Sequence, residues 1–586
     1  MKHRGSTRLV RDSIKVVAIC LVVSAVATNA GPSASAQTPS SGGEIVFRSG
    51  YGTDYVDPGL TWYTFGWMLS NATNRPLYSF SPDQPDQPIP DLAESDPVIS
   101  ADNKSVTVTI KPGIMFSPPV NREVTSQDVK YAVERAFTKH VSNGYVFTYF
   151  SDLAGAPNEP GPLTDIPGIQ TPDDLTIVFT LETPSAPAFA AALVMPITVP
   201  VPKEYARPFD REDPSAYDTH VVFTGPYMIR NNAEGRLVGL GDDIEIVRNP
   251  NWDPATDFRP AYLDEITIRT GGEDIDRMAR RTLAGSHRLC CDAGSFEAIK
   301  EFLSTYPDQI GSMPGHGTRW VSLNTTIRPL KNLNVRKALF AAMDRRALRR
   351  ARGGPLAGRI ATHFIASGVP GFEESGGYAG FTDLDFTQHP GGDPALAKSY
   401  MLEARRDGVP ITRRGKYSGD KNLLMVGVDY PPGDGVARRV KRQVEELGFE
   451  VDLRLVPPDE MYQKYCGVPA ARVAICPNVG WFIDFMDPQS LLEPTFSGDH
   501  IRPGENLANW SLLDRPKINE AIDEAALVSG PERYDAWAEV NHMITALAPG
   551  IPYIWDINYA LESADVEGVM NPYTATWDLS FTSLKT

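Results

Sequence analysis

Two carboxylates lie within a run of large apolar residues near the end of the chain, from Gly480 to Pro488. The apolar neighbours of Asp484 predict that its side chain is buried. A buried carboxylate is costly unless a cation pairs with it. That cation is either a Lys or Arg of the protein or a charged ligand group such as an amine, and the residues alone leave both open. Asp487, just before Pro488, is expected to be a turn or cap residue.

No sequence motif for a catalyst accompanies these carboxylates. The nucleophile elbow, the zinc-protease helix, the P-loop, the dinucleotide glycine fingerprint and S-x-x-K are all missing from their required contexts. The nine histidines are dispersed, with no i, i+4 pair to hold a metal. We therefore expect neither an enzyme nor a metal or other cofactor, and a secreted hydrolase of peptides or glycans stays a distant alternative.

Composition and charge exclude several other classes of protein. With 42% apolar residues and nine tryptophans in 586 residues, the chain can bury a large core, and its length predicts two to four domains. Residues 1–36 hold five of the 56 Lys and Arg and one of the 73 acidic residues, which leaves 51 basic and 72 acidic groups, or −21, beyond them. This charge repels phosphate backbones, so nucleic acid is not an expected partner.

The amino terminus has the layout of a secretory signal peptide, residues 1–36. Five Lys and Arg precede an apolar run at 16–27, and Ala34-Ser35-Ala36 stands before Gln37, which predicts cleavage after Ala36. The run is shorter than the roughly 20 residues that span a bilayer. Cys20 lies inside the run instead of closing it, so lipid anchoring there is the minority alternative. We expect a secreted, periplasmic or cell-envelope protein.

Four cysteines lie beyond this segment: Cys290, Cys291, Cys466 and Cys476. They allow three pairings, and their spacing does not fit a zinc site. Cys466 and Cys476 bracket a short loop with Pro and Gly, which makes them the candidate disulfide.

Apolar periodicity predicts a mixture of strands and helices. Strands are expected at 44–48, 106–110, 175–181, 320–323, 423–428 and 449–455; helices are expected after Thr125, whose spacing from Asp128 resembles a capping box, at about 335–350, and at 436–447. The segments 423–428, 436–447 and 449–455 form a strand–helix–strand crossover. Such units build open α/β sheets that bind ligands near the strand ends.

Several short segments occur in the order typical of one protein family. They are Pro90–Ser95, Ile110–Ser117 with Val124–Val129, Thr224–Tyr227, Arg248–Trp252, Asn324-Thr325 with Val335–Leu339 and Met343–Arg345, and the Gly480-Trp481…Asp484…Asp487-Pro488 run. On these segments the chain resembles the oligopeptide/dipeptide/nickel class (family 5) of extracytoplasmic solute-binding proteins, which serve ABC importers.

The resemblance implies an α/β, two-lobed periplasmic-binding-protein-like fold of type II, in the class with an extra inserted domain. The ligand would lie between the lobes. Lobe I would be discontinuous, with 44–78, 210–317 and 549–586; the inserted domain II would take 79–209 and lobe III 318–548. A monomer that delivers its ligand to the permease subunits is implied.

The resemblance also implies a set of ligand-binding residues. The Asp of the G-W-x-x-D pattern pairs with the α-amino group of a peptide in this family, which assigns that role to Asp484. The expected set is Asp484, Gly480, Trp481, Phe482, Trp62, Tyr63, Thr64, Tyr145, Phe147, Tyr149 and Trp555, the last with core packing as its alternative. Lobe closure would strengthen the pair, and water-filled side-chain pockets would tolerate many peptides.

One position departs from the family pattern. Asn478 stands two residues before Gly480, where peptide-binding members can carry an Arg near the ligand. The alternatives are therefore a receptor of the same fold for arginine or another amino acid, a nickel chelate, haem or an oligosaccharide. A role in a specialised biosynthetic pathway belongs to the same alternatives. An envelope protein with a structural or chaperone-like role is a third class.

Overall fold

The computed structural model describes residues 39–50, 52–241, 243–271, 274–290, 295–502 and 508–586. Pro39–Thr586 is one compact unit. The predicted signal peptide, its cleavage point and Cys20 lie outside the described residues, as does Cys291. No helix in the described residues has the length and apolarity needed to cross a membrane.

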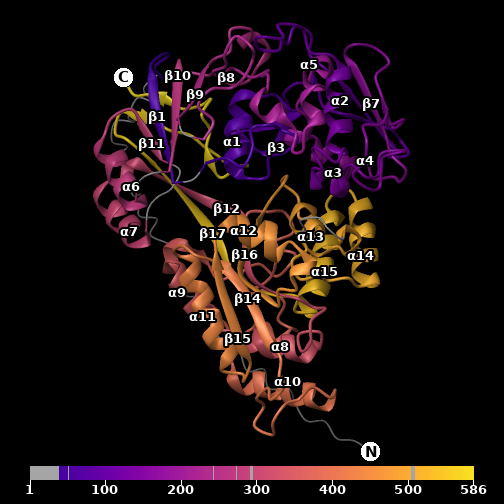
Figure 1. Cartoon of the computed structure of the whole chain (residues 1–586), viewed down its shortest axis with the longest axis vertical. Helices are drawn as coiled ribbons and strands as arrows, with labels where there is room; N and C mark the ends of the chain where they lie inside the picture. The colour runs from indigo at the N-terminus through magenta and orange to yellow at the C-terminus, as the bar shows by residue number, and fades with distance from the viewer. Residues whose placement is uncertain (1–38, 51, 242, 272–273, 291–294, 503–507) are drawn as a thin grey trace, which may run out of the picture. The chain divides into compact units, whose positions relative to one another are not determined.

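A large mixed sheet runs through the unit, and its two longest strands join two groups of shorter ones (Figure 1). The strand order is β15-β14-β16-β12-β17-β11-β1-β10-β9-β8, with β13 paired to β17. The central strands are β12 (Ile310–Leu323) and β17 (Gly550–Glu562), an antiparallel pair. Strands β12 and β17 each pair with strands of both groups, so the chain passes twice from one lobe to the other.

One group of strands in this sheet lies on the β11 side of the central pair, with its own helices. These are β1 (Glu44–Ser49), β8 (Tyr227–Ile229), β9 (Asp243–Arg248), β10 (Glu265–Thr270) and β11 (Arg288–Cys290), with α1 (Thr64–Thr73), α6 (Ile275–Ala284) and α7 (Phe296–Thr305). Alternate residues of β1, such as Ile45 and Phe47, are buried in one core with residues of α1. The strand predicted at 44–48 is confirmed.

A second, four-stranded sheet of order β4-β5-β7-β6 lies between β1 and β8 in sequence. Its strands are β4 (Val98–Ile99), β5 (Ser105–Thr109), β6 (Ile169–Gln170) and β7 (Thr176–Thr180), next to the hairpin β2 (Tyr78–Ser81) and β3 (Gln84–Pro90) and the helices α2 (Ser126–Ala136), α3 (Gly144–Tyr149), α4 (Ala186–Ala191) and α5 (Lys203–Ala206). Helix α2 begins with the predicted capping box, in which the Thr125 N–H donates to Asp128 Oδ2 at 2.8 Å. Its buried face packs with β5 and β7 in a separate core.

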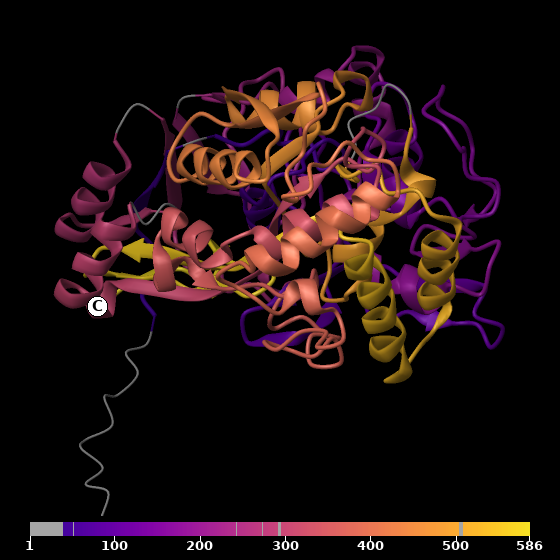
Figure 2. The same ribbon diagram turned by 90° about the horizontal axis from the view of Figure 1, so that it is seen from below.

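The other group of strands in the large sheet contains the predicted crossover. Strands β14 (Asn422–Val428) and β15 (Glu450–Val456) are parallel and are joined by α11 (Gly433–Glu445). The other elements are α10 (Pro394–Arg406), α12 (Pro458–Glu460), β16 (Ile475–Phe482), α13 (Gln489–Phe496), α14 (Pro516–Leu527) and α15 (Glu532–Ala546). Helix α11 lies on one side of these strands, and α14 and α15 lie on the other side (Figures 1 and 2).

The single helix predicted at about 335–350 is wrong. The structure has two helices, α8 (Leu333–Ala342) and α9 (Arg345–Arg352). Met343 is extended, and the Asp344 carboxylate caps α9 by accepting the Ala347 N–H at 2.8 Å. The apolar periodicity does not indicate the break between the two helices, because the apolar residues of both helices are buried in the same core.

Candidate ligand-binding site

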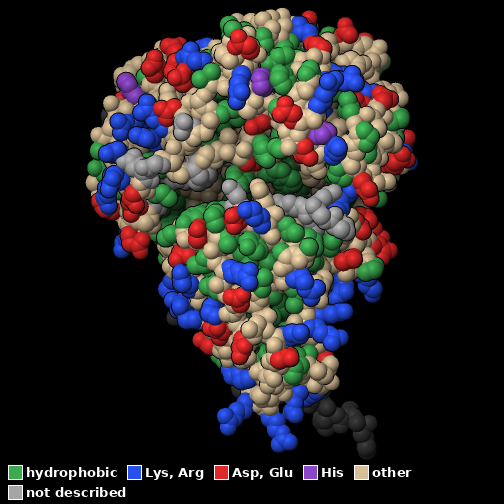
Figure 3. Space-filling model, viewed as in Figure 1, with side chains coloured by type: hydrophobic (Ala, Val, Ile, Leu, Met, Phe, Trp, Pro, Cys, Tyr) green, Lys and Arg blue, Asp and Glu red, His purple; other side chains and the backbone are tan. Residues whose placement is uncertain are grey.

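A groove crosses one face of the molecule between its two halves, and hydrophobic side chains are visible in its walls (Figure 3). The carboxyl ends of β14 and β16 point toward this boundary in Figure 1. Ligands of open α/β sheets bind at such strand ends. The segment after β16, which contains Asp484, is therefore well placed for binding.

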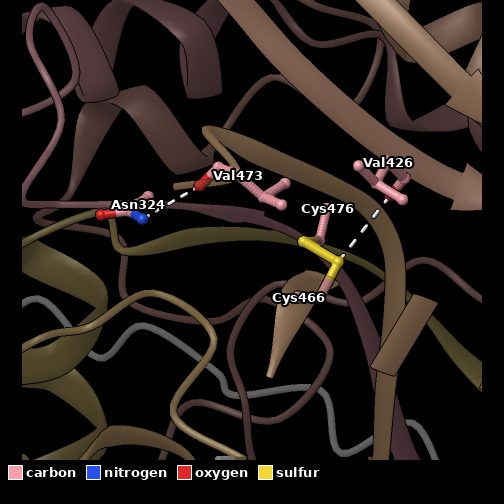
Figure 4. Close-up of a disulfide and its surroundings, with 5 residues drawn as sticks. All are labelled: Asn324, Val426, Cys466, Val473 and Cys476. Carbon is pink, nitrogen blue, oxygen red and sulfur yellow. Dashed lines mark hydrogen bonds between the residues drawn. A yellow bond between two sulfur atoms is a disulfide. The ribbon is translucent and has the colours of Figure 1, made fainter. Parts of the chain in front are cut away.

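A disulfide fixes the start of β16. Cys466, the last residue of the short π-helix (Met461–Cys466) that follows α12, is bonded to Cys476 in the strand, with 6.2 Å between the Cα atoms (Figure 4). This is the bridge that the sequence favoured. Close by, Asn324 Nδ2 donates to the Val473 carbonyl at 2.9 Å. These contacts hold the strand that carries the candidate residues.

Asp484 is buried, with 3% of its surface exposed. The hydroxyl of Tyr149, from α3 of the inserted segment, donates to Asp484 Oδ2 at 2.6 Å. The Tyr573 hydroxyl, from the carboxyl-terminal part of the chain, donates to the Asp484 carbonyl. Three distant segments therefore meet at this residue.

Asp484 has no cationic partner within the described residues: no Lys, Arg or His forms an ion pair with it there. Burial raises its pKa to about 8, and hydrogen bonding from Tyr149, Tyr145 and Trp481 lowers the pKa without offsetting the burial. Burial and the nearby carboxylate also raise the pKa of both tyrosines. The site therefore has hydrogen-bond donors for a carboxylate but lacks the charge that would keep it ionised at neutral pH.

Asp487 lies three residues further on and is fully paired. Arg533 donates to it from Nε at 2.7 Å and from Nη2 at 3.0 Å. Asp487 Oδ1 also accepts the Gln489 N–H at 2.9 Å, at the start of α13. The turn role that was expected for Asp487 agrees with this contact to the residue two positions on, and the ion pair with Arg533 adds to it.

Some of the predicted aromatic residues gather around Asp484. The ring of Tyr145 lies 6.4 Å from that of Trp481 and 4.6 Å from that of Trp62. Tyr149 stacks on Tyr145 at 6.2 Å. Trp62 is 37% exposed, which makes it the most accessible member of the group. The result is an aromatic wall around the buried carboxylate.

Other predicted residues have different surroundings. Phe147 packs edge-on against Phe137, with 5.3 Å between the two ring centroids. Trp555, on β17, is 2% exposed in the core that also contains residues of α14 and α15, and its ring lies 5.0 Å from that of His363. Core packing, the alternative stated for Trp555, describes this environment.

The remaining predicted positions have contacts of a different kind. The backbone N–H of Tyr63 donates to Asp54 Oδ2 at 3.1 Å, and Thr64 is the exposed first residue of α1. Gly480 and Phe482 lie on β16, beside Arg319 of β12.

Sequence reasoning missed two features of this region. Tyr573 contacts Asp484, and its ring lies 5.8 Å from that of Trp67. Arg319 and Arg352 share the carboxylate of Asp556. Neither feature has a local signal, because each depends on residues far apart in the chain.

The described residues hold no cluster of three or more His, Cys, Asp or Glu that fits a metal ion. His363, the most buried histidine, has a pKa of about 3 because of burial, and its Nε2 lies 3.1 Å from the Gly377 carbonyl. What the geometry offers instead is an enclosed carboxylate with an aromatic wall, which suits recognition of an organic cation.

Known proteins are similar to this chain over most of its length. The model of the bacterial extracellular solute-binding proteins, family 5 Middle, matches residues 87–502. A probable ABC transporter periplasmic-binding protein SapA of Escherichia coli is 22% identical over 476 residues, 78% of this chain and 76% of that protein. The oligopeptide-binding protein OppA of Bacillus subtilis is 23% identical over 482 residues, 77% of this chain and 81% of that protein.

Solved structures show the same fold. A clavulanic acid biosynthesis oligopeptide binding protein 2 matches with a TM-score of 0.79 and 24% identity, over 94% of this chain and 97% of that one. The DppA periplasmic binding protein of Helicobacter pylori, solved with the peptide STSA, matches with a TM-score of 0.75 and 20% identity, over 93% of this chain and 99% of that one. The predicted fold class is confirmed.

Proposed function

The chain belongs to family 5 of the bacterial extracellular solute-binding proteins, and from this premise we propose that it captures peptides with a free amino terminus between its lobes. It then presents them to the permease of an ABC importer. The observation that carries the proposal is Asp484, a buried carboxylate with tyrosine donors and no cation among the described residues. The α-ammonium of a peptide would supply that charge. Relatives named as oligopeptide-binding and dipeptide-binding proteins support this ligand class.

Binding would follow from lobe closure, with no chemistry on the ligand. Tyr149 comes from the inserted segment and Asp484 from lobe III, so the closed form completes the ammonium site. Excluding water lowers the local dielectric and strengthens the pair. Backbone groups at the strand ends can pair with the peptide main chain as an added strand would.

The finer predictions from the sequence form part of this proposal. The protein acts as a monomeric binder without a cofactor, outside the cytoplasm after removal of residues 1–36. We divide it into lobe I (44–78, 210–317 and 549–586), inserted domain II (79–209) and lobe III (318–548). The course of β12 and β17 supports this division, because both strands run between the two groups of the sheet.

A ligand screen tests the proposal. The protein would be purified under denaturing conditions and refolded to remove carried ligand. Its thermal shift would then be measured with peptides, acetylated peptides, free amino acids, sugars and nickel. We expect stabilisation by peptides with free amino termini and little by their acetylated forms.

The same screen separates the alternatives. Stabilisation by sugars or nickel alone would contradict the peptide assignment and favour another ligand class of the same fold. A response to arginine alone would keep the role of Asp484 and change the ligand. Peptides recovered cleaved instead of intact would identify a hydrolase.

A further inference from the structure

The narrow end of the molecule has a charge opposite to that of the rest. Lys and Arg side chains gather there (Figure 3), in the region of α10 (Figure 1). Residues 394–421, which contain α10 and the segment that leads to β14, have seven Lys and Arg and three Asp and Glu, a net charge of +4. Because residues 37–586 carry −21 in total, the part outside this segment carries −25. The basic end is therefore local, and the net charge of the chain does not reveal it.

Helix α10 is anchored by its apolar side chains. Ala397, Met401 and Ala404 are buried in the core that also contains residues of α8 and α11. Their spacing of three and four residues places them on one face of the helix. Lys398 and Arg405, seven residues apart, share another side of the helix, and both are exposed. The core contacts therefore fix the helix so that these cations stay at the surface.

A tight turn after α10 adds two further cations. The Gly415 N–H donates to the Thr412 carbonyl at 3.0 Å, which closes a four-residue turn with Arg413 and Arg414 at its centre. Both arginines are exposed. Gly415 has a φ of +78°, a left-handed conformation that glycine adopts without strain. A Cβ at Gly415 would lie 2.7 Å from Lys398 Cγ, so the turn lies directly beside α10.

Five exposed cations make up this surface, which we name the basic tip: Lys398, Arg405, Arg406, Arg413 and Arg414. In the part of the chain that the structure describes, none of them forms an ion pair. Arg405 and Arg406 lie in the last turn of α10, where a positive charge matches the negative end of the helix dipole. The dipole does not account for Arg413 and Arg414, which lie on the turn beyond the helix.

The acidic residues of the same segment do not neutralise the tip. Asp407 accepts hydrogen bonds from Asn332 Nδ2 at 2.8 Å and from Asn334 Nδ2 at 2.9 Å, so its partners are neutral amides. Glu403 and Asp420 are exposed, and neither has an ion pair among the described residues. The segment keeps its net positive charge, and the charge faces solvent.

We propose that the basic tip binds the anionic phospholipid headgroups of a membrane surface. The tip is convex (Figure 3), so it suits an extended negative surface better than a single small anion. The chain belongs to an extracellular family, and membrane phospholipid is an anionic surface present there. Each Lys or Arg close to an anionic bilayer adds to binding, and at an ionic strength of about 0.1 M the attraction falls off within about 10 Å.

The charge distribution also sets the orientation of the bound protein. The same bilayer repels the −25 of the remaining chain, so the molecule approaches with the tip first. The groove between the two halves lies away from the tip (Figure 3) and stays open to ligand. This inference goes beyond the proposed function and does not depend on which ligand is bound. If the proposed function holds, the contact keeps the receptor near the membrane that contains its importer.

Vesicle co-sedimentation with charge-matched variants tests this surface. The protein from Gln37 onward would be mixed, in low and in high salt, with vesicles of phosphatidylcholine that contain or lack phosphatidylglycerol. The tip variant carries Arg406→Gln, Arg413→Gln and Arg414→Gln, and the control loses the same charge from exposed arginines elsewhere, Arg207→Gln, Arg211→Gln and Arg236→Gln. We expect phosphatidylglycerol to increase binding of the wild type at least about tenfold in low salt, and high salt to abolish the increase. The tip variant should lose the increase, and the control should keep it.

Other outcomes would overturn the proposal. Equal binding of the wild type to both kinds of vesicle would remove the membrane as the partner. Equal losses in the tip variant and the control would show that net charge acts and the tip does not. Salt-sensitive self-association without vesicles, lost in the tip variant, would identify the acidic surface of a second copy as the partner. If the tip variant does not fold, replacement of Arg413 and Arg414 alone gives the same comparison, and their exchange for Lys should preserve binding.

Discussion

Asp484 and Asp487 are three residues apart and both are buried, yet their environments differ in one decisive way. Arg533 forms two hydrogen bonds with the carboxylate of Asp487. Asp484 has the hydroxyl of Tyr149 and no cation within the described residues. The fold supplies a charged partner for the carboxylate of Asp487. It supplies none for Asp484 within the described residues, so a cation that pairs with Asp484 would come from a ligand. Asp487 therefore stabilises the fold, whereas the missing charge partner of Asp484 supports the ligand role that we propose for it.

The largest expected effect separates the two carboxylates by stability. Asp487→Asn leaves the Arg533 guanidinium buried without a counter-charge, which costs about 3–5 kcal/mol in the free energy of unfolding. Urea denaturation followed by circular dichroism measures this loss. Asp484→Asn is the matched variant and should not lower stability at pH 7. Equal destabilisation by the two substitutions would remove the distinction.

The pH dependence of the free energy of unfolding gives a second way to distinguish Asp484 from Asp487. The pKa of Asp484 is about 8 in the folded protein against 3.8 for an ordinary Asp, so between these values the native state holds a proton that the unfolded state lacks. Its contribution to stability is complete below about pH 4 and is lost as the pH rises toward 8, by up to about 1.4 kcal/mol per pH unit. The tyrosines that face it, Tyr145, Tyr149 and Tyr573, have raised pKa values and stay neutral in this range.

Unfolding of the ligand-free wild type and Asp484→Asn from pH 5 to 8 measures this contribution. The stability of the variant relative to the wild type should increase with pH. Parallel curves would show that Asp484 is already ionised and paired in the empty protein.

A smaller effect is expected when a donor to Asp484 is removed. Tyr149→Phe deletes a hydrogen bond of 2.6 Å to the carboxylate that would hold the ammonium. The loss of a hydrogen bond to a charged group should weaken peptide binding by about 1.5–3 kcal/mol, measured by calorimetry. Tyr227→Phe is the control, because that buried hydroxyl donates to the Leu263 carbonyl in lobe I. If both variants bind equally well, Tyr149 has no part in the site.

The smallest effect concerns a contact between lobe III and the inserted segment. The Arg502 guanidinium lies 4.3 Å from the ring centroid of Phe147 and donates to the Asn158 carbonyl. Arg502→Ala should weaken the closed form by about 0.5–1 kcal/mol and speed peptide dissociation a few-fold. Stopped-flow dissociation measures this, with the exposed Arg405→Ala of α10 as control. An unchanged rate would show that the contact does not hold the closed form.

Local patterns predicted much of the fold. The crossover of β14, α11 and β15 and the capping box of α2 depend on residues close together in the chain, and both were found. The predicted helix at about 335–350 failed at a single residue, since Asp344 can continue a helix or cap a new one. Periodicity does not distinguish these outcomes when both keep the same residues buried.

The candidate site was only half predictable. The burial of Asp484 followed from its apolar neighbours, and the resemblance added Tyr145 and Tyr149. The contacts of Tyr573 with Asp484 and of Arg319 with Asp556 join residues 89 and 237 positions apart. Charge balance at such a site depends on which strands become neighbours, and the sequence pattern does not contain that information.

We propose that Asp484 pairs with the ammonium of the ligand, and a cycle of four dissociation constants tests this pairing. One peptide, with its amino terminus free or acetylated, would be titrated into the wild type and into Asp484→Asn. We predict that acetylation weakens binding to the wild type by about 2–5 kcal/mol and has little effect on the variant. The same penalty for acetylation in both proteins would contradict the claim.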